Sequence, residues 1–221
     1  MTEDEQRDAV VACARDLERR RLNHGTAGNV SARFGDDVLV TPSGIAPARL
    51  RRRDIVRLDA AGRPTPGQRV PTSEWRLHVA LLSTRPDVNA VVHTHSPEAT
   101  AVACLRESIP AVHYAVAWAG ASVVPCADYA TYGSAELAAN VVAAIGAGGA
   151  CLLANHGLVT VGATLTEARA LAVEIEWLAQ VWRLARSHGA PVHVLDDAEM
   201  ARIAERFAGY GQRDDQARRG S

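Results

Sequence analysis

Two histidines separated by one residue close an apolar run: His93 and His95 follow residues 88–92. Because side chains alternate along a strand, this spacing places both imidazoles on one face. Imidazoles on one face can chelate a divalent metal when other segments supply further ligands. Glu74, which precedes the pair, and His156, which follows it, are the candidates. The sequence therefore predicts a metal site of one carboxylate and three imidazoles.

The type of these four ligands narrows the choice of metal. Three imidazoles and one carboxylate, with no thiolate, favour Zn²⁺, with Mn²⁺ or Co²⁺ as alternatives. Glu74 suits a displaceable position, because a carboxylate can leave the metal and act as a general base. A closed structural site or ordinary core histidines are the competing interpretation. His78 lies four residues after Glu74 on the same helical face and could compete as a ligand, but a supporting or packing role is favoured.

Three turns rich in glycine and hydroxyl residues form a second candidate site, at residues 25–29, 41–44 and 72–73. Backbone N–H groups in glycine turns and at helix N-termini bind anions, and Ser, Thr and Asn side chains add neutral donors. Such turns are common and alone would mean little. However, Ser73 is adjacent to Glu74, so the sequence predicts a phosphate pocket beside a metal and a phosphorylated, metal-chelating substrate.

Helix and strand patterns alternate along the chain, and these elements must position the candidate metal and phosphate residues. The capping box Thr2-x-x-Glu5 starts an amphipathic helix that we expect to end near residues 23–25, and residues 59–71 are expected to form a surface loop. Further helices are expected from Thr72 and Ser73 to residues 85–86, after Ser96, and over residues 136–145. The longest helix is expected to begin at Thr164, with an apolar stripe that runs to Trp182. Strands are expected near Val30 and at residues 38–40, 88–95, 122–124 and 151–154. This alternation predicts an α/β layered fold.

Composition bounds the class of protein. The 221 residues are 48% hydrophobic and 22% charged, which predicts one globular domain. The net charge of −1 gives no overall electrostatic field that would attract nucleic acid or a membrane surface. Four widely spaced cysteines without a CxxC pair indicate a reducing compartment, and no long apolar run follows the N-terminus, so we expect a cytoplasmic protein. Residues 1–211 are expected to form a single domain and residues 212–221 a polar, frayed tail.

The chain resembles the class II aldolase/adducin family, and within it the L-fuculose-1-phosphate aldolase branch. The resemblance runs in order along nearly the whole chain. It rests on GTAGNVSAR at 25–33, TPSG at 41–44, SEWRLH at 73–78, RPDVNAVVHTH at 85–95, SIPAVHY at 108–114, PCADYATYG at 125–133, NHGL at 155–158 and YGQR at 210–213.

The resemblance implies a three-layer α/β/α fold with a mixed, largely antiparallel sheet, and a homotetramer with active sites at subunit interfaces. It assigns metal ligation to Glu74, His93, His95 and His156. It assigns phosphate binding to Thr26, Gly28, Asn29, Ser43, Gly44, Thr72 and Ser73. Tyr114 matches the family's catalytic tyrosine, supplied by a neighbouring subunit, and Tyr210 matches a mobile C-terminal tyrosine.

The implied reaction is metal-dependent retro-aldol cleavage of a ketose 1-phosphate, L-fuculose 1-phosphate, to dihydroxyacetone phosphate and L-lactaldehyde. Glu74 would move the proton at C3 and Tyr114 the oxygen proton of the departing aldehyde. A lysine Schiff base is excluded, because the chain contains no lysine.

Alternatives remain open at this stage. An L-ribulose-5-phosphate 4-epimerase shares the scaffold, although that branch usually has aspartate where this chain has Glu74. Another deoxyketose-1-phosphate aldolase, a dehydratase and a non-catalytic adducin-like interaction module are the others. Thr94, residues 96–98, Tyr132 and Asn155 depart from the aldolase pattern, which leaves the aldehyde open.

Overall fold

A seven-stranded sheet forms the centre of the molecule in the computed structural model, which describes residues 1–208. Its order is β3-β2-β1-β4-β9-β8-β7. The strands are β1 (Asn29–Phe34), β2 (Asp37–Val40), β3 (Val56–Leu58), β4 (Ala90–Thr94), β7 (Cys126–Ala127), β8 (Ala150–Leu153) and β9 (Gly157–Gly162). Neighbours are antiparallel except for the parallel pair β7 and β8, which confirms the mixed, largely antiparallel sheet. The short strands β5 (Ile109–Pro110) and β6 (Val123–Val124) pair separately.

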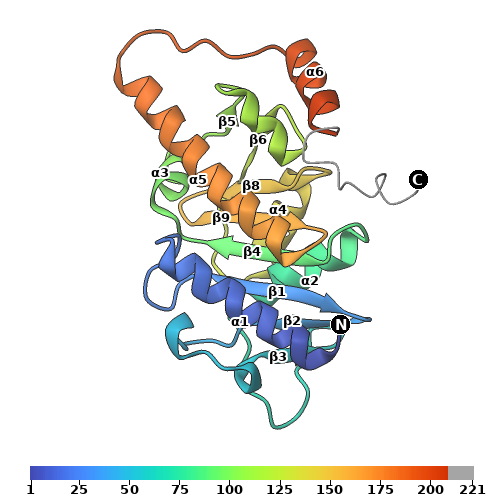
Figure 1. The fold of residues 1–221 in the computed structure, drawn as a ribbon. Helices are drawn as coiled ribbons and strands as arrows, with labels where there is room; N and C mark the ends of the chain where they lie inside the picture. Colours follow the sequence, from blue (N-terminus) through green and yellow to red (C-terminus); the bar gives the residue numbers. More distant parts are fainter. Residues whose placement is uncertain (209–221) are drawn as a thin grey trace, which may run out of the picture.

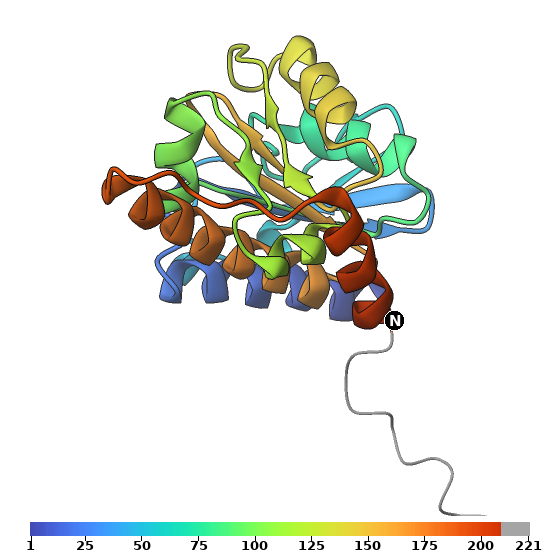
Figure 2. The same cartoon turned by 90° about the horizontal axis from the view of Figure 1, so that it is seen from above.

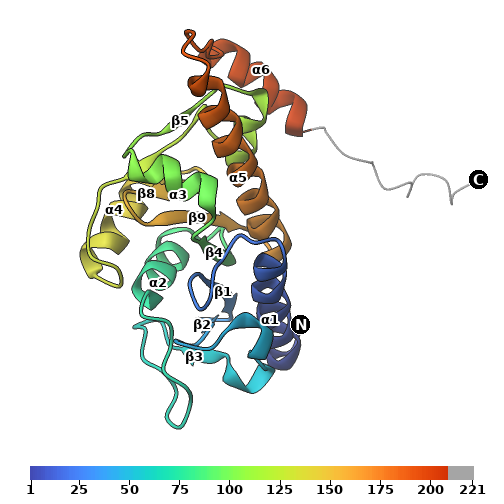
Figure 3. The same ribbon diagram turned by 90° about the vertical axis from the view of Figure 1, so that its left-hand side faces the viewer.

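Helices cover both faces of this sheet (Figures 1 and 2). On one face lie α1 (Glu3–Arg19), α5 (Leu165–Ser187) and α6 (Asp197–Ala208). On the other lie α2 (Trp75–Thr84) and α4 (Ala135–Ile145), as Figure 3 also shows. The helix α3 (Pro97–Cys104) and the 3-10 turns η1 (Pro47–Arg49), η2 (Arg52–Asp54) and η3 (Tyr114–Ala119) complete the elements. Each face has its own buried apolar cluster, so the three-layer α/β/α arrangement is confirmed.

Strand β4 lies at the middle of the sheet and determines where its histidine points. Val91 belongs to the apolar cluster beneath α2 and α4, whereas Val92 belongs to the cluster beneath α1 and α5. Since side chains alternate, His93 shares the α2 and α4 face with Val91. Its register partners are Asn29 on β1 and Val159 on β9. The strand thus holds one imidazole at the centre of the sheet.

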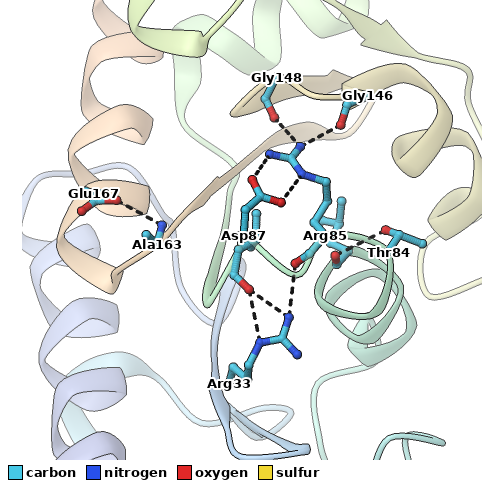
Figure 4. A network of polar contacts seen from close by, with 10 residues as sticks. Arg33, Thr84, Arg85, Asp87, Gly146, Gly148, Ala163 and Glu167 are labelled. Carbon is cyan, nitrogen blue, oxygen red and sulfur yellow. Dashed lines mark hydrogen bonds and ion pairs between the residues drawn. The ribbon is translucent and has the colours of Figure 1, made fainter. Parts of the chain in front are cut away.

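A polar network ties down the connection that leads into β4 (Figure 4). Arg33 on β1 donates to the carbonyl of Val88 at 2.9 Å and to that of Arg85 at 3.2 Å. The Arg85 guanidinium in turn pairs with Asp87 at 2.6 Å and donates to the carbonyl of Gly148 at 3.0 Å. The end of α2, the start of β4 and the turn after α4 are therefore fixed against each other.

The predicted starts of α1 and α5 are confirmed, with a complete capping box at α1 and an N-cap hydrogen bond at α5. Thr2 and Glu5 exchange hydrogen bonds with each other's backbone N–H, and Thr164 accepts from the N–H of Glu167 at 3.1 Å. The long helix α5 buries Ala168, Ala172, Ile175, Leu178 and Ala179 on the predicted stripe. Within residues 1–208, no helix is long and apolar enough to cross a membrane.

Two predicted boundaries are wrong. The first helix ends at Arg19 rather than near residues 23–25, because the chain leaves the helical conformation at Arg21, whose φ is 60°. The helix α2 has Glu74, not Thr72 or Ser73, at its N-cap position. Thr72 instead accepts a hydrogen bond from the N–H of Glu74 at 3.3 Å, so its hydroxyl supports the residue that begins the helix.

Candidate metal centre and phosphate cleft

Three segments bring the predicted metal ligands together. Glu74 precedes the first turn of α2, His93 lies in β4, His95 follows β4 directly, and His156 lies in the turn between β8 and β9. One ligand atom from each of the four residues lies within 4.8 Å of the others. The sequence prediction that these residues converge is therefore supported by their positions.

The ligand atoms face a common point. The Nε2 atom of His93 lies 3.1 Å from Oε2 of Glu74 and 3.0 Å from Nε2 of His95. Nε2 of His156 lies 3.2 Å from Oε1 of Glu74. The three imidazole rings are separated by 4.9 to 5.0 Å between centroids and meet edge to face. Such a cluster presents several Nε2 atoms and one carboxylate to the same small space.

Neighbouring backbone groups orient two of these residues. His93 donates from Nδ1 to the carbonyl of Leu158 at 2.9 Å, which leaves Nε2 with its lone pair toward the cluster. The backbone N–H of His95 donates to Oδ1 of Asn23 at 3.0 Å. Sequence analysis missed both contacts, because neither a backbone carbonyl nor a lone asparagine after a helix carries a ligand pattern.

Burial favours the neutral form of His95 and His156, whereas contacts with His93 keep the carboxylate of Glu74 charged. Burial alone would also lower the pKa of His93, but attraction and hydrogen bonding from Glu74 outweigh it, and the pKa of His93 is raised. Desolvation, together with the positive charge that His93 would carry, lowers the pKa of His95 and that of His156 to about 4. Burial alone would raise the pKa of Glu74, but attraction and hydrogen bonding from His93 and attraction from His156 outweigh it, and the pKa is lowered. Neutral imidazole and ionised carboxylate are the protonation states that bind a metal.

The cluster fits a divalent metal ion. Oε1 of Glu74 is buried and has no hydrogen-bond partner among residues 1–208. A buried carboxylate oxygen without a partner is costly unless a cation compensates it. Three imidazoles and one carboxylate are the donor types that zinc and its first-row neighbours accept.

A cavity of about 440 Å³ opens beside the metal candidates. Glu74, His95 and His156 line it together with all seven residues that the resemblance assigns to phosphate: Thr26, Gly28, Asn29, Ser43, Gly44, Thr72 and Ser73. Tyr129, Ala130, Tyr132 and Asn155 form another part of its wall. Among the described residues, its lining includes no arginine, so the residues predicted to bind phosphate are all uncharged.

Two glycines allow the close approaches that this site requires. A Cβ atom on Gly157 would lie 2.4 Å from the carbonyl oxygen of Thr94 and 3.4 Å from the His93 ring. Gly133 has φ of 74°, and its Cβ atom would lie 2.5 Å from the carbonyl oxygen of Ser73. Gly157 therefore lets β9 begin against the histidines, and Gly133 lets the loop carrying Tyr132 approach the phosphate turns.

The remaining predicted site residues lie elsewhere. Tyr114 begins η3, is 51% exposed, and is not part of the cavity wall; its ring packs 4.4 Å from that of His113. Tyr210 lies outside the described residues, as do residues 212–221 of the predicted tail. His78 is fully buried, and both ring nitrogens have hydrogen-bond partners, Ser31 and Asn29, which supports the supporting role over ligation.

Comparisons with known proteins show which proteins this chain is similar to. The family model "Class II Aldolase and Adducin N-terminal domain" matches residues 8–183. A 5-methylthioribulose-1-phosphate/5-deoxyribulose-1-phosphate aldolase of Rhodospirillum rubrum is 48% identical, covering 93% of this chain and 92% of the relative. An L-fuculose phosphate aldolase of Escherichia coli K12 is 44% identical, covering 92% of this chain and 94% of the relative. A solved L-fuculose 1-phosphate aldolase superposes with a TM-score of 0.89 at 38% identity, over 92% of this chain and 96% of that one.

Proposed function

This chain belongs to the class II aldolase and adducin family and is an aldolase, and we propose that it cleaves the C3–C4 bond of a ketose 1-phosphate. The products would be dihydroxyacetone phosphate and an aldehyde. One observation carries the proposal: a Glu/His cluster and a cradle of neutral anion donors line the same cavity. A ketose 1-phosphate would suit both parts of this cavity, because its phosphate on C1 lies next to the C2 and C3 oxygens that can bind a metal.

Glu74, His93, His95 and His156 would hold the metal, for which the donor set favours Zn²⁺ over Mn²⁺ and Co²⁺. When bound, a divalent metal supplies Lewis-acid stabilisation of the negative charge that develops at the C2 oxygen. The chain itself must supply the remaining steps: the phosphate contacts, the orientation of C3, and the movement of protons.

Glu74 would move the C3 proton. In the cleavage direction, the C4 hydroxyl loses its proton, the C3–C4 bond breaks, and its electron pair passes to C3 and C2. A proton must then be added at C3 to give dihydroxyacetone phosphate. The Glu74 carboxyl lies at the cavity wall with Oε1 lacking a hydrogen-bond partner among the described residues, so it can carry that proton.

The aldehyde is the part of the substrate on which the relatives differ. The relatives are named for L-fuculose phosphate and for two ribulose 1-phosphates that lack a free 5-hydroxyl. All three would leave an uncharged aldehyde. A cavity wall of Tyr129, Ala130, Tyr132 and Asn155, without a cationic side chain, suits an uncharged end. We therefore place L-fuculose 1-phosphate and the 5-deoxy and 5-methylthio ribulose 1-phosphates in the substrate class.

The tyrosine that takes the proton of the C4 hydroxyl would come from a partner copy. Tyr114 is half exposed on η3 and does not reach the cavity wall of its own subunit. A homotetramer with active sites at subunit interfaces would bring Tyr114 of a neighbouring copy to the aldehyde side, where it would take the proton of the C4 hydroxyl. Tyr210 would join it from the C-terminal segment.

A panel of sugar phosphates tests this proposal. Zinc-loaded protein is mixed with L-fuculose 1-phosphate, 5-deoxyribulose 1-phosphate, 5-methylthioribulose 1-phosphate, fructose 1,6-bisphosphate and L-ribulose 5-phosphate. We expect release of dihydroxyacetone phosphate from the first three and much less from the bisphosphate, whose departing aldehyde is charged. Epimerisation of L-ribulose 5-phosphate without triose phosphate release from any substrate would contradict the proposal.

A further inference from the structure

A buried hydrogen-bonded chain leads from the candidate metal centre into the space between α2 and β1. Nδ2 of Asn29 lies 2.9 Å from Oε2 of Glu74. Oδ1 of the same amide contacts Nε2 of His78, and Nδ1 of His78 lies 2.7 Å from the hydroxyl of Ser31. Asn29 is 6% exposed, while His78 and Ser31 are fully buried. Four side chains therefore form one continuous connection.

The charge of Glu74 determines the direction of every hydrogen bond in this chain. An ionised carboxylate only accepts, so the Asn29 amide must direct its NH₂ group to Glu74 and its carbonyl oxygen to His78. His78 must then carry its hydrogen on Nε2, and its Nδ1 must accept from the Ser31 hydroxyl. A reversed amide would place a carbonyl oxygen against the carboxylate. The arrangement of hydrogens is thus assigned by the network as a whole.

His78 has no other use in the site. Burial lowers its pKa to about 3, so the ring is neutral. Both ring nitrogens have hydrogen-bond partners, Ser31 and Asn29, and neither partner is one of the four candidate metal ligands. A packing role alone would not require an imidazole here, since a buried ring with two satisfied nitrogens costs more to desolvate than an apolar side chain of similar volume.

We propose that His78 is a positioning residue that locks the Asn29 amide, and through it the Glu74 carboxylate, in the orientation that binds the metal. Holding Oε2 by Asn29 leaves Oε1 as the oxygen without a fixed donor. Asn29 also lines the phosphate cleft, so the same amide connects the carboxylate to the anion turns. The inference rests on the metal site proposed above and extends it to residues that make no contact with the ion.

Substitutions at residue 78 separate a donor from a space-filling role. In His78→Gln, the side-chain NH₂ can reach the place of Nε2 and donate to Asn29. In His78→Asn, the shorter side chain can reach only toward Ser31, and in His78→Phe the volume is kept but both hydrogen bonds are lost. Zinc affinity is measured on the purified full chain by competition with a chromophoric chelator. The visible spectrum of the cobalt-loaded protein reports the ligand geometry.

We expect the Phe and Asn variants to bind zinc about 10- to 100-fold more weakly, the usual effect of losing a group that supports a metal ligand, and the Gln variant to recover most of that loss. Their cobalt spectra should shift in the same order. Wild-type affinity in His78→Phe would overturn the inference, and so would equal losses in all three variants.

Ser31→Ala keeps the proposal testable if a residue 78 variant fails to fold. It removes only the outermost hydroxyl, frees Nδ1 of His78, and should weaken zinc binding by about threefold to 10-fold. Thr160→Val is its matched control: Thr160 is also a fully buried strand hydroxyl, but it bonds the carbonyl of Ala168 on α5 and not the chain. Equal effects of the two variants would overturn the inference. Absence of zinc binding in the wild type would overturn the metal site as well, so the two failures are distinguishable.

Discussion

Oε1 of Glu74 lies 3.2 Å from Nε2 of His156, yet it accepts no hydrogen bond from any of the described residues. The two atoms come from opposite sides of the site, one from the start of α2 and the other from the β8–β9 turn. A buried carboxylate oxygen beside an imidazole nitrogen without a shared hydrogen requires a cation to become favourable. This pair is therefore the best place to test the metal site.

Replacing His156 with Ala should abolish stoichiometric zinc binding. The change removes one of three imidazoles and leaves Glu74 Oε1 without a facing ligand, so we expect affinity to fall by at least about 100-fold. His188→Ala is the control, because His188 follows α5 at its C-terminal end and is exposed. Metal content per chain is measured by atomic emission after dialysis. Zinc should also raise the melting temperature of the wild type and of the control but not of His156→Ala. Equal metal content in both variants would exclude His156 as a ligand.

Glu74→Gln should separate metal binding from proton movement. Glutamine keeps the shape of the side chain and an oxygen ligand but cannot take up a proton. We expect exchange of the C3 proton of dihydroxyacetone phosphate with D₂O, followed by NMR, to fall by about 10²- to 10⁴-fold. The comparison is made at zinc concentrations that give full occupancy. Glu136→Gln is the control, because it makes the same chemical change at an exposed position of α4 that does not line the cavity. Wild-type exchange in fully loaded Glu74→Gln would assign the base to another residue.

Gly157→Ala should destabilise the protein and weaken metal binding together. Its Cβ atom would lie 2.4 Å from the carbonyl oxygen of Thr94, so β9 and the end of β4 must separate. We expect a loss of about 1 to 3 kcal/mol in the free energy of unfolding, typical of overpacking. Gly67→Ala is the control: its φ is 83° and its Cβ would meet nothing within 4 Å, so only the backbone cost of about 1 kcal/mol applies. Urea unfolding and zinc affinity are measured on both. A Gly157→Ala protein with unchanged zinc affinity would show that the strands tolerate the separation.

The candidate metal ligands could be predicted from the sequence, while the residues that support them could not. His93 and His95 carry an i, i+2 pattern on an apolar strand, and Glu74 and His156 stand where predicted elements begin or end, so residue type and position both pointed to the site. Asn23 contributes through one side-chain oxygen that accepts a backbone hydrogen bond from His95. Such a contact depends on where two distant segments meet, and a single sequence does not contain that information.

The same limit applies to the fold. The alternation of helix and strand patterns predicts the layers, and capping residues predict where α1 and α5 begin. The mixed, largely antiparallel character of the sheet came from the family resemblance, and the order of its strands was not predicted. The end of α1 was wrong because the left-handed conformation of Arg21 is set by its surroundings, and arginine carries no preference for it. Tyr114 could be selected only by resemblance, since an exposed tyrosine has no ligand pattern.

Asp16 should make the protein's stability depend on acid pH. It accepts hydrogen bonds from Arg19, the last residue of α1, and from Arg20 just after it, and it lies 3.2 Å from Arg169 of α5. Hydrogen bonds from Arg19 and Arg20, opposed by burial, lower its pKa to about 2, against about 3.9 in an unfolded chain. A carboxyl whose folded pKa is lowered stabilises the protein above its unfolded pKa. That stabilisation is lost as the pH falls from about 4 to about 2.

Asp16→Asn should therefore lower the free energy of unfolding at pH 7 by about 1 kcal/mol, a value that allows for screening of the partly exposed arginines. The difference from the wild type should shrink as the pH falls from about 4 toward 2, because protonated wild-type Asp16 then resembles the variant. Urea unfolding between pH 2.5 and 7 measures this, where the protein remains folded before urea is added. Asp36→Asn, on the exposed turn between β1 and β2, makes the same change in net charge. If Asp36→Asn reproduced the pH dependence of the difference, net charge rather than the Asp16 contacts would be responsible.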